Sequence, residues 1–117
     1  MKEPRVRDNI TEAERDALRA ICQGTPERSV WADAVAILAD YRFEDETHQL
    51  IFDTLREIRT GDPRTIREQL AARLNNKGFP DLDLDVFFQP HGLSAEQATS
   101  LMRALRTTGS GPSRKET

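Results

Sequence analysis

Residues 45–61, DETHQLIFDTLREIRTG, decide the fold class that this sequence predicts. Asp45 can accept hydrogen bonds from the free N–H groups of a first helical turn. Ile51, Phe52 and Leu55 then follow at the spacing that places apolar side chains on one face of a helix, and Ile58 continues it. Gly61 can adopt the left-handed conformation that ends helices. The stretch therefore predicts an amphipathic helix that ends at this glycine.

Similar helix signals lie on both sides of this stretch. Capping boxes, in which a Ser or Thr and an acidic or amide residue three positions later satisfy each other's backbone N–H groups, occur three times. The three pairs are Thr11 with Glu14, Thr65 with Glu68, and Ser94 with Gln97. A further helix is predicted from about 27–29 to 39. Because it is apolar over more than half its circumference, we expect it near the middle of the core.

Residues 79–90 carry a mixed signal. Leu82, Leu84 and Val86 alternate with aspartates, which is the two-residue period of a strand, but no second strand pattern exists to pair with them. We therefore predict an extended loop that passes into one helical turn at 85–88. The fold class is all-α, a compact orthogonal bundle of five to six short helices. We expect a flexible arm at 1–9, a helical domain at 10–106 and a disordered tail at 107–117.

Composition narrows the class of protein. The chain has 117 residues, enough for one domain, and a formal net charge of −3. A protein that binds DNA phosphates usually has a basic excess, so this balance argues against that function. No apolar stretch approaches the length of a membrane-spanning helix, and no leader-like apolar segment follows the basic start. With a single cysteine, we expect a cytoplasmic protein without disulfides that contacts no membrane.

The residues that could carry chemistry are few and scattered. His48 and His91 are the only histidines, and Cys22 sits on an apolar helical face, where we expect a packing role. His48, beside three acidic residues, is interpreted as a surface or interface histidine. The aspartates at 81, 83 and 85 resemble the start of a calcium loop, but its required glycine and final acid are missing. We predict no catalytic residue, no metal and no cofactor, and hence not an enzyme.

The charge pattern favours contact with another macromolecule. Residues 56–77 contain six basic and three acidic side chains, whereas residues 40–53 contain one basic and five acidic ones. Such neighbouring regions suit docking onto a protein or onto a second copy, as in a homodimer. The alternative is a nucleic-acid-binding domain that uses 56–77, and a third hypothesis is a small enzyme built on His48. The interaction candidates are Trp31, His48, Arg56, Arg59, Arg64, Arg67, Phe87 and Phe88.

Burial in the core competes with exposure for each aromatic candidate. Aromatic residues dominate interface hot spots when they are exposed, but large apolar side chains are more often buried. Phe87 and Phe88 are adjacent on a short helical turn, so the two rings cannot both point at the same interior. We therefore expect one of them to lie on an open surface.

The order of residues from Glu12 to Leu74 resembles the N-terminal helical domain of bacterial replicative DNA helicases of the DnaB type. The most similar stretch is 43–52, in which an aromatic residue is followed by His48 and then by Ile51-Phe52. The helicase-binding C-terminal region of bacterial primases has the same small helical fold. The resemblance implies this fold and helix-mediated protein contact in replication assemblies. It does not imply ATP hydrolysis, because the ATPase domain with its phosphate loop is missing from this sequence.

Overall fold

Five α-helices and one short 3₁₀ helix make up the computed structural model, which describes residues 6–107. Their bounds are α1 Val6–Gln23, α2 Trp31–Ile37, α3 Glu46–Ile58, α4 Pro63–Asn76, η1 Leu84–Phe88 and α5 Ala95–Leu105. No strand occurs among these described residues, and the prediction of an all-α, compact bundle is confirmed. Most of the predicted arm at 1–9 and tail at 107–117 lies outside the described residues.

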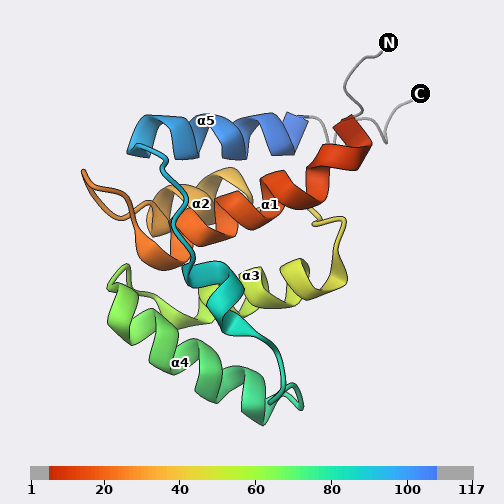
Figure 1. Ribbon diagram of the computed structural model, residues 1–117, viewed down its shortest axis with the longest axis vertical. Coiled ribbons are helices and arrows are strands. Elements are labelled where there is room, and N and C mark those ends of the chain that lie inside the picture. Colours follow the sequence, from red (N-terminus) through yellow and green to blue (C-terminus); the bar gives the residue numbers. More distant parts are fainter. Residues whose placement is uncertain (1–5, 108–117) are drawn as a thin grey trace.

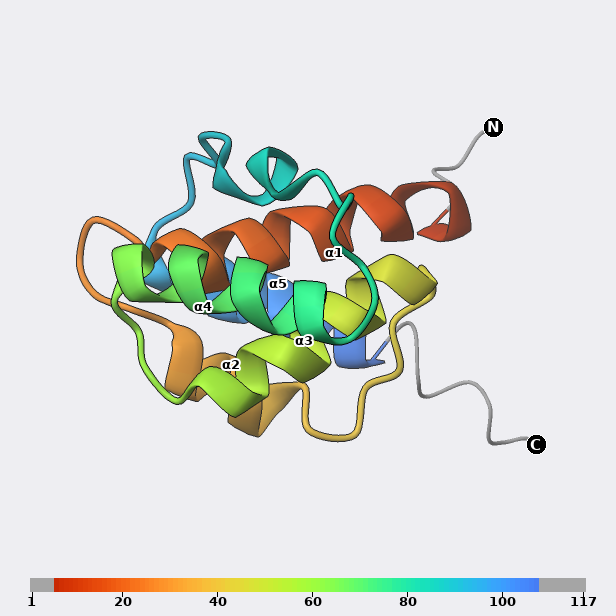
Figure 2. The same cartoon turned by 90° about the horizontal axis from the view of Figure 1, so that it is seen from below.

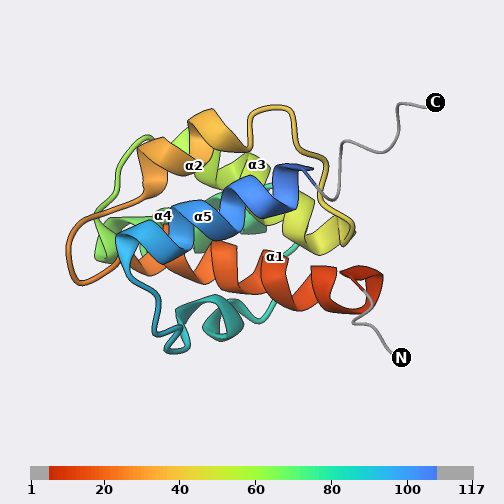
Figure 3. The same ribbon diagram turned by 90° about the horizontal axis from the view of Figure 1, so that it is seen from above.

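α1 is the central helix of the bundle. It packs against α2, α3, α4, α5 and η1, whereas the other helices share only the contacts α3 with α4 and α2 with α5 among the stronger pairs. α5 lies on one side of α1, and α3 and then α4 lie on the other (Figure 1). Seen from below, α4 crosses in front of part of α3 (Figure 2). Seen from above, α5 lies over α1 and α2 (Figure 3).

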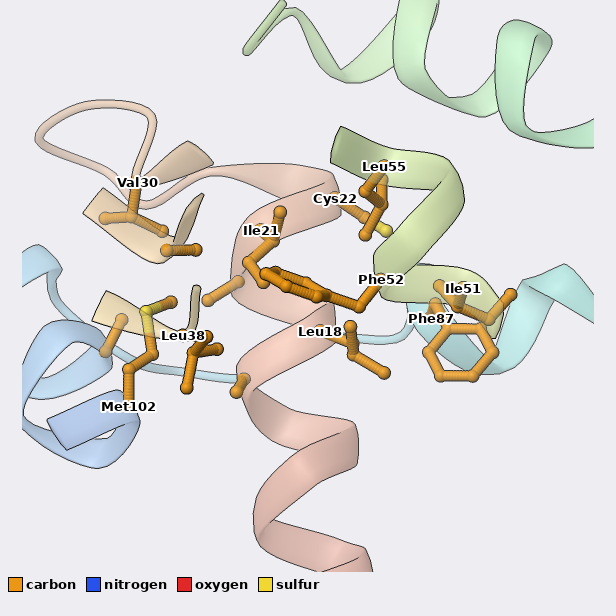
Figure 4. Close-up of a cluster of buried hydrophobic side chains, with 14 of the residues drawn as sticks. Leu18, Ile21, Cys22, Val30, Leu38, Ile51, Phe52, Leu55, Phe87 and Met102 are labelled. Atoms are coloured by element: carbon orange, nitrogen blue, oxygen red, sulfur yellow. The ribbon is translucent and has the colours of Figure 1, made fainter. Parts of the chain in front are cut away.

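The core forms where α1 faces α3 and the ends of α2. The ring of Phe52 lies among apolar side chains from several helices (Figure 4) and packs on Phe43 with ring centroids 5.2 Å apart. Burying a side chain of this size contributes about 2–3 kcal/mol. The labelled side chains around it are Leu18, Ile21, Cys22, Val30, Leu38, Ile51, Leu55, Phe87 and Met102.

The first helix, α1, starts earlier than predicted. The helix begins at Val6, so Thr11 is not its N-cap, and the predicted arm ends earlier than residue 9. Glu14 lies in the middle of the helix and is fully buried. Its neighbours at i+3, i+4 and i+7 are Ala17, Leu18 and Ile21, all buried, so it projects from the apolar face of α1 rather than back to a cap.

α2 is shorter and more peripheral than predicted. It starts at Trp31 because residues 25–28 form a turn in which Thr25 and Arg28 bond each other through backbone and hydroxyl groups. Within the helix only Ala34 is buried, although Val30 and Leu38 at its ends are buried too. The expectation that this apolar helix lies near the middle of the core is therefore wrong, because α1 takes that place.

α3 begins where the sequence predicts but ends earlier than predicted. Asp45 caps the helix as predicted, but the helix ends at Ile58, and Arg59 takes the left-handed conformation with φ 60°. Gly61 was predicted to supply this stop, and that prediction is wrong. A Cβ on Gly61 would lie 2.2 Å from Oγ of Ser29, so the glycine is needed for a close approach of two loops.

α4 starts at a different cap from the one predicted. Asp62 is the N-cap and accepts hydrogen bonds from the backbone N–H and the hydroxyl of Thr65, with Pro63 in the first position. The predicted Thr65 and Glu68 capping box is therefore wrong. A proline suits this position because the first helical N–H groups have no partner within the helix.

Residues 79–93 follow the prediction closely. They form an extended connection with η1 at Leu84–Phe88, where one helical turn was expected. Two side chains of α1 hold it: Arg19 Nε donates to the Val86 carbonyl at 2.7 Å, and the Gln23 amide donates to two carbonyls of this segment at 2.6 and 3.1 Å. α5 then begins with the predicted capping box of Ser94 and Gln97.

Candidate functional site

A fully buried carboxylate lies where α1 meets the start of α3. Oε2 of Glu14 accepts hydrogen bonds from the Tyr41 hydroxyl at 2.6 Å and from the backbone N–H of Glu44 at 2.6 Å. Oε1 lies 3.0 Å from Nδ1 of His48, and the backbone N–H of Asp45 donates to it at 3.4 Å. Tyr41 and His48 are also buried. We call Glu14, Tyr41 and His48 the Glu14 cluster.

The Glu14 cluster satisfies its own polar groups. Each carboxylate oxygen of Glu14 has two polar neighbours, Oε2 the Tyr41 hydroxyl and the Glu44 N–H, and Oε1 the His48 ring nitrogen and the Asp45 N–H. Burial and the adjacent Glu14 carboxylate raise the pKa of the Tyr41 hydroxyl above its usual range, so the hydroxyl remains a donor. Because the donors come from α3 and from the connection before it, this carboxylate fixes the start of α3 on α1.

His48 is not the surface or interface histidine that the sequence predicts. Its side chain is buried, and its ring lies edge-on to Phe87, with centroids 5.8 Å apart. A histidine paired with a carboxylate is a common catalytic arrangement, but a general base must reach a bound substrate. The buried His48 ring is in contact with protein groups instead, so its role is to position α3.

Cys22 and His91 also have structural roles. Burial raises the pKa of the Cys22 thiol to about 12, so the thiol is protonated and unreactive, as expected for a packing residue. Nε2 of His91 lies 3.0 Å from the carbonyl of Gly24, and Nδ1 accepts the backbone N–H of Leu93 at 3.0 Å. His91 thereby joins two loops. Within residues 6–107, no group of three or more potential ligands is placed to hold a metal ion.

The aromatic candidates differ in exposure. Trp31 is half-buried, and its indole N–H donates to the Leu55 carbonyl at 2.9 Å. Phe87 is buried, whereas Phe88 is half-buried beneath the guanidinium of Arg67, which lies 4.7 Å from the ring centroid. The two adjacent rings thus point to different environments, as expected, although Phe88 is covered in part by a cation.

Half of the basic side chains of 56–77 are held by acidic partners. Glu57 bonds both Arg73 at 3.2 Å and Lys77 at 2.7 Å, and Arg67 pairs with Asp85. The hydrogen bond from Lys77, more than any other contact, holds the pKa of Glu57 below its usual value. Arg56, Arg59 and Arg64 are exposed and form no ion pair with the residues that the structure describes.

A groove lies between α4 and the connection that follows it. We call it the α4–loop groove. It has a volume of about 290 Å³. Its lining residues are Arg67, Ala71, Leu74, Phe79, Pro80, Leu82, Asp83, Leu84 and Asp85. Phe79 is 45% exposed and is the only large apolar side chain among the described residues that is exposed. Two other hollows lie at 39–53 and at 23–97.

Sequence reasoning missed Glu14 and Phe79. The signal for Glu14 was its position on the apolar face with Ala17, Leu18 and Ile21, and this position competes with its role as a capping-box partner. The signal for Phe79 was its place directly after Gly78, where an apolar residue commonly packs back on the last turn of a helix.

No protein-family model, curated protein or solved structure is similar enough to match this chain. None of the helices between residues 6 and 107 has the length and apolar character needed to cross a membrane.

Proposed function

We propose that this chain is a non-enzymatic helical module that binds protein, either by self-association or by docking onto a replication-type partner. The α4–loop groove carries the proposal. It combines the exposed ring of Phe79 with apolar lining residues such as Leu82 and Leu84 and with charged ones, among which Arg67 pairs with Asp85. Exposed aromatic anchors beside apolar hollows are typical of protein interfaces.

The distribution of titratable groups also supports this proposal. The residues most suited to catalysis are buried, namely His48, Cys22 and Glu14. His48 and Glu14 contact each other, and Cys22 packs in the core. Exposed charged side chains on α3, α4 and the connection to η1 can instead steer the approach of a complementary surface. The resemblance to the helicase N-terminal domain is the reason for proposing a replication-type partner.

The proposal is tested by measuring two kinds of binding with the purified chain. Light scattering across the micromolar to millimolar range detects self-association. Biolayer interferometry against the replicative helicase and the primase of the organism that encodes the chain detects docking. We expect saturable binding in at least one of these measurements. A monomer at every concentration that binds neither protein would overturn the proposal.

The nucleic-acid alternative rests on Arg56, Arg59 and Arg64. These three side chains are exposed, whereas Arg67, Arg73 and Lys77 pair with carboxylates. Only half of the basic residues of 56–77 therefore remain for contacts with phosphates. Binding through phosphate contacts weakens steeply with added salt. Fluorescence anisotropy with a labelled duplex and a labelled single strand at two salt concentrations decides this alternative, and no binding at low salt removes it.

A further inference from the structure

His91 joins the end of α1 to the connection that leads into α5. Its Nε2 lies 3.0 Å from the Gly24 carbonyl, and its Nδ1 accepts the backbone N–H of Leu93 at 3.0 Å. A neutral histidine ring has one N–H donor and one acceptor nitrogen. Because the Leu93 N–H must meet a lone pair, Nδ1 carries no hydrogen, and the ring hydrogen on Nε2 faces the Gly24 carbonyl. The two bonds together therefore require the neutral ring.

Protonation of His91 would change only one of these two bonds. A protonated ring has a hydrogen on each nitrogen, so Nε2 still donates to Gly24 while Nδ1 can no longer accept the Leu93 N–H. Histidine is the side chain whose charge ordinarily changes between about pH 5 and 8. The half-buried ring of His91 lines the hollow at 23–97, which is open to solvent. A proton can therefore reach the ring and break the bond to Leu93.

The turn at 91–93 has room to respond to the loss of this bond. Gly92, at its centre, has a φ of 68°, and a Cβ on it would meet no described residue within 4 Å apart from its chain neighbours. Leu93 is half-buried and packs against the core. Since glycine adopts most backbone conformations at little cost, rotation at Gly92 can move Leu93 away from the core. This turn is thus the part of the connection that can open.

Two other side chains hold the segments on either side of the turn. The Gln23 amide donates to two carbonyls before it, and Oε1 of Glu27 accepts the N–H of Ala95, the first residue of α5, at 2.9 Å. This last bond, more than any other contact, lowers the pKa of the Glu27 carboxyl, so Glu27 stays ionised in weakly acidic solution. Of the described residues that line the hollow, only His91 and Glu27 titrate, since α1 and α5 contribute the uncharged Gln23 and Gln97.

We propose that His91 makes this turn sensitive to pH: protonation of its ring opens residues 91–93 about Gly92 and exposes the side chain of Leu93. The contacts on both sides of the turn keep α1 and α5 in place. The connection between η1 and α5 is therefore a conformational switch within an otherwise unchanged bundle. The inference goes beyond the proposed binding function and is independent of it, because it involves neither the α4–loop groove nor a partner.

NMR spectroscopy of the full chain tests this switch. At about pH 8, long-range proton–nitrogen spectra of the histidine rings should show a hydrogen on Nε2 of His91 and none on Nδ1. The exchange rate of the Leu93 amide hydrogen, relative to that of an unstructured chain at the same pH, should rise about three- to tenfold between about pH 8 and 5.5. As an internal control, the Ala98 amide, which donates to the Ser94 carbonyl within α5, should keep its protection.

Two substitutions at His91 identify the responsible group. The short side-chain amide of His91→Asn can accept the N–H two residues further on at any pH, so the Leu93 amide should stay protected in weakly acidic solution. His91→Ala removes the acceptor, so the relative exchange rate of Leu93 should be about three- to tenfold higher at both pH values. Both variants keep His48, which controls for its titration, and circular dichroism checks that each variant is folded.

Several results would overturn the inference. A His91 ring with its hydrogen on Nδ1 at the higher pH contradicts the assigned bonds. Equal relative exchange of Leu93 at the two pH values shows that the turn does not open. A rise that persists in His91→Asn assigns the pH dependence to another group, such as His48. Loss of protection at Ala98 together with Leu93 shows that the bundle unfolds as a whole and that the turn is not a local switch.

Discussion

The Glu14 cluster and the α4–loop groove both combine charged and aromatic residues, but they differ in what surrounds them. In the cluster every polar partner of Glu14 comes from this chain and is buried with it. In the groove Phe79, Pro80 and Asp83 are exposed to solvent. A buried polar group must be satisfied internally, whereas an exposed one is free to meet another molecule. The cluster therefore specifies the fold, and the groove is available for binding.

Removing the central carboxylate is expected to have the largest effect. Glu14→Ala leaves the buried donors of Tyr41, His48 and the start of α3 without an acceptor, so the free energy of unfolding should fall by about 3–5 kcal/mol. Urea denaturation followed by circular dichroism measures this. Glu12→Ala, at an exposed position of the same helix, should change it by less than about 0.5 kcal/mol. Equal effects of the two substitutions would contradict a structural role for the cluster.

Removing one donor from the cluster is expected to cost less. Tyr41→Phe keeps the ring that packs on Phe43 but deletes the hydroxyl that donates to Glu14, so we expect a loss of about 2 kcal/mol. A double-mutant cycle with Glu14→Gln should show coupling of about 1 kcal/mol or more. Additive effects would mean that this hydrogen bond contributes little.

The groove should tolerate the loss of its aromatic side chain. Phe79→Ala is expected to lower the free energy of unfolding by about 1 kcal/mol, because the ring is 45% exposed. Phe52→Ala, which removes the same ring from the core, should lower it by about 3–5 kcal/mol. Thermal or urea unfolding of the two variants compares them. If Phe79→Ala destabilises the chain as much as Phe52→Ala does, the ring belongs to the core and not to a binding surface.

The smallest effect is expected at the surface ion pairs of α3 and α4. Because Lys77 holds the pKa of Glu57 below its usual value, the unfolded chain takes up this proton first as the pH falls. The contribution of Glu57 is present above its unfolded pKa and is lost as the pH falls through its folded pKa. Glu57→Gln should cost about 0.5 kcal/mol at neutral pH and flatten the acid limb of the stability curve. An unchanged acid limb in urea titrations would show that the pairs are fully screened.

The parts of the fold that local patterns predicted are those that depend on neighbours in sequence. Asp45 caps α3, Ser94 and Gln97 form their capping box, and a helical turn occurs at η1, because each uses bonds within one or two turns. Gly61 fits the local rule for a helix stop equally well. The structure requires a glycine there for another reason, because a side chain would collide with Ser29, which lies 32 positions earlier.

The candidate site was only partly accessible from the sequence. Arg64 and Arg67 were identified from the charge pattern, but the pairing of Arg67 with Asp85 joins residues 18 positions apart, which no local period reveals. The same holds for Glu14 and His48, 34 positions apart. Exposure of Phe79 depends on how the chain leaves α4 and on what packs beside it, so the sequence alone could not distinguish it from the buried phenylalanines.

The central position of α1 has a consequence for how the chain folds during synthesis. α1 is made before α5, yet the two helices pack against each other. A ribosome-bound chain that lacks α5 leaves part of the apolar surface of α1 and α2 in water, where it can associate with other apolar segments. The bundle can therefore close only after α5 has left the ribosome, and removing α5 should yield an insoluble product rather than a smaller folded one.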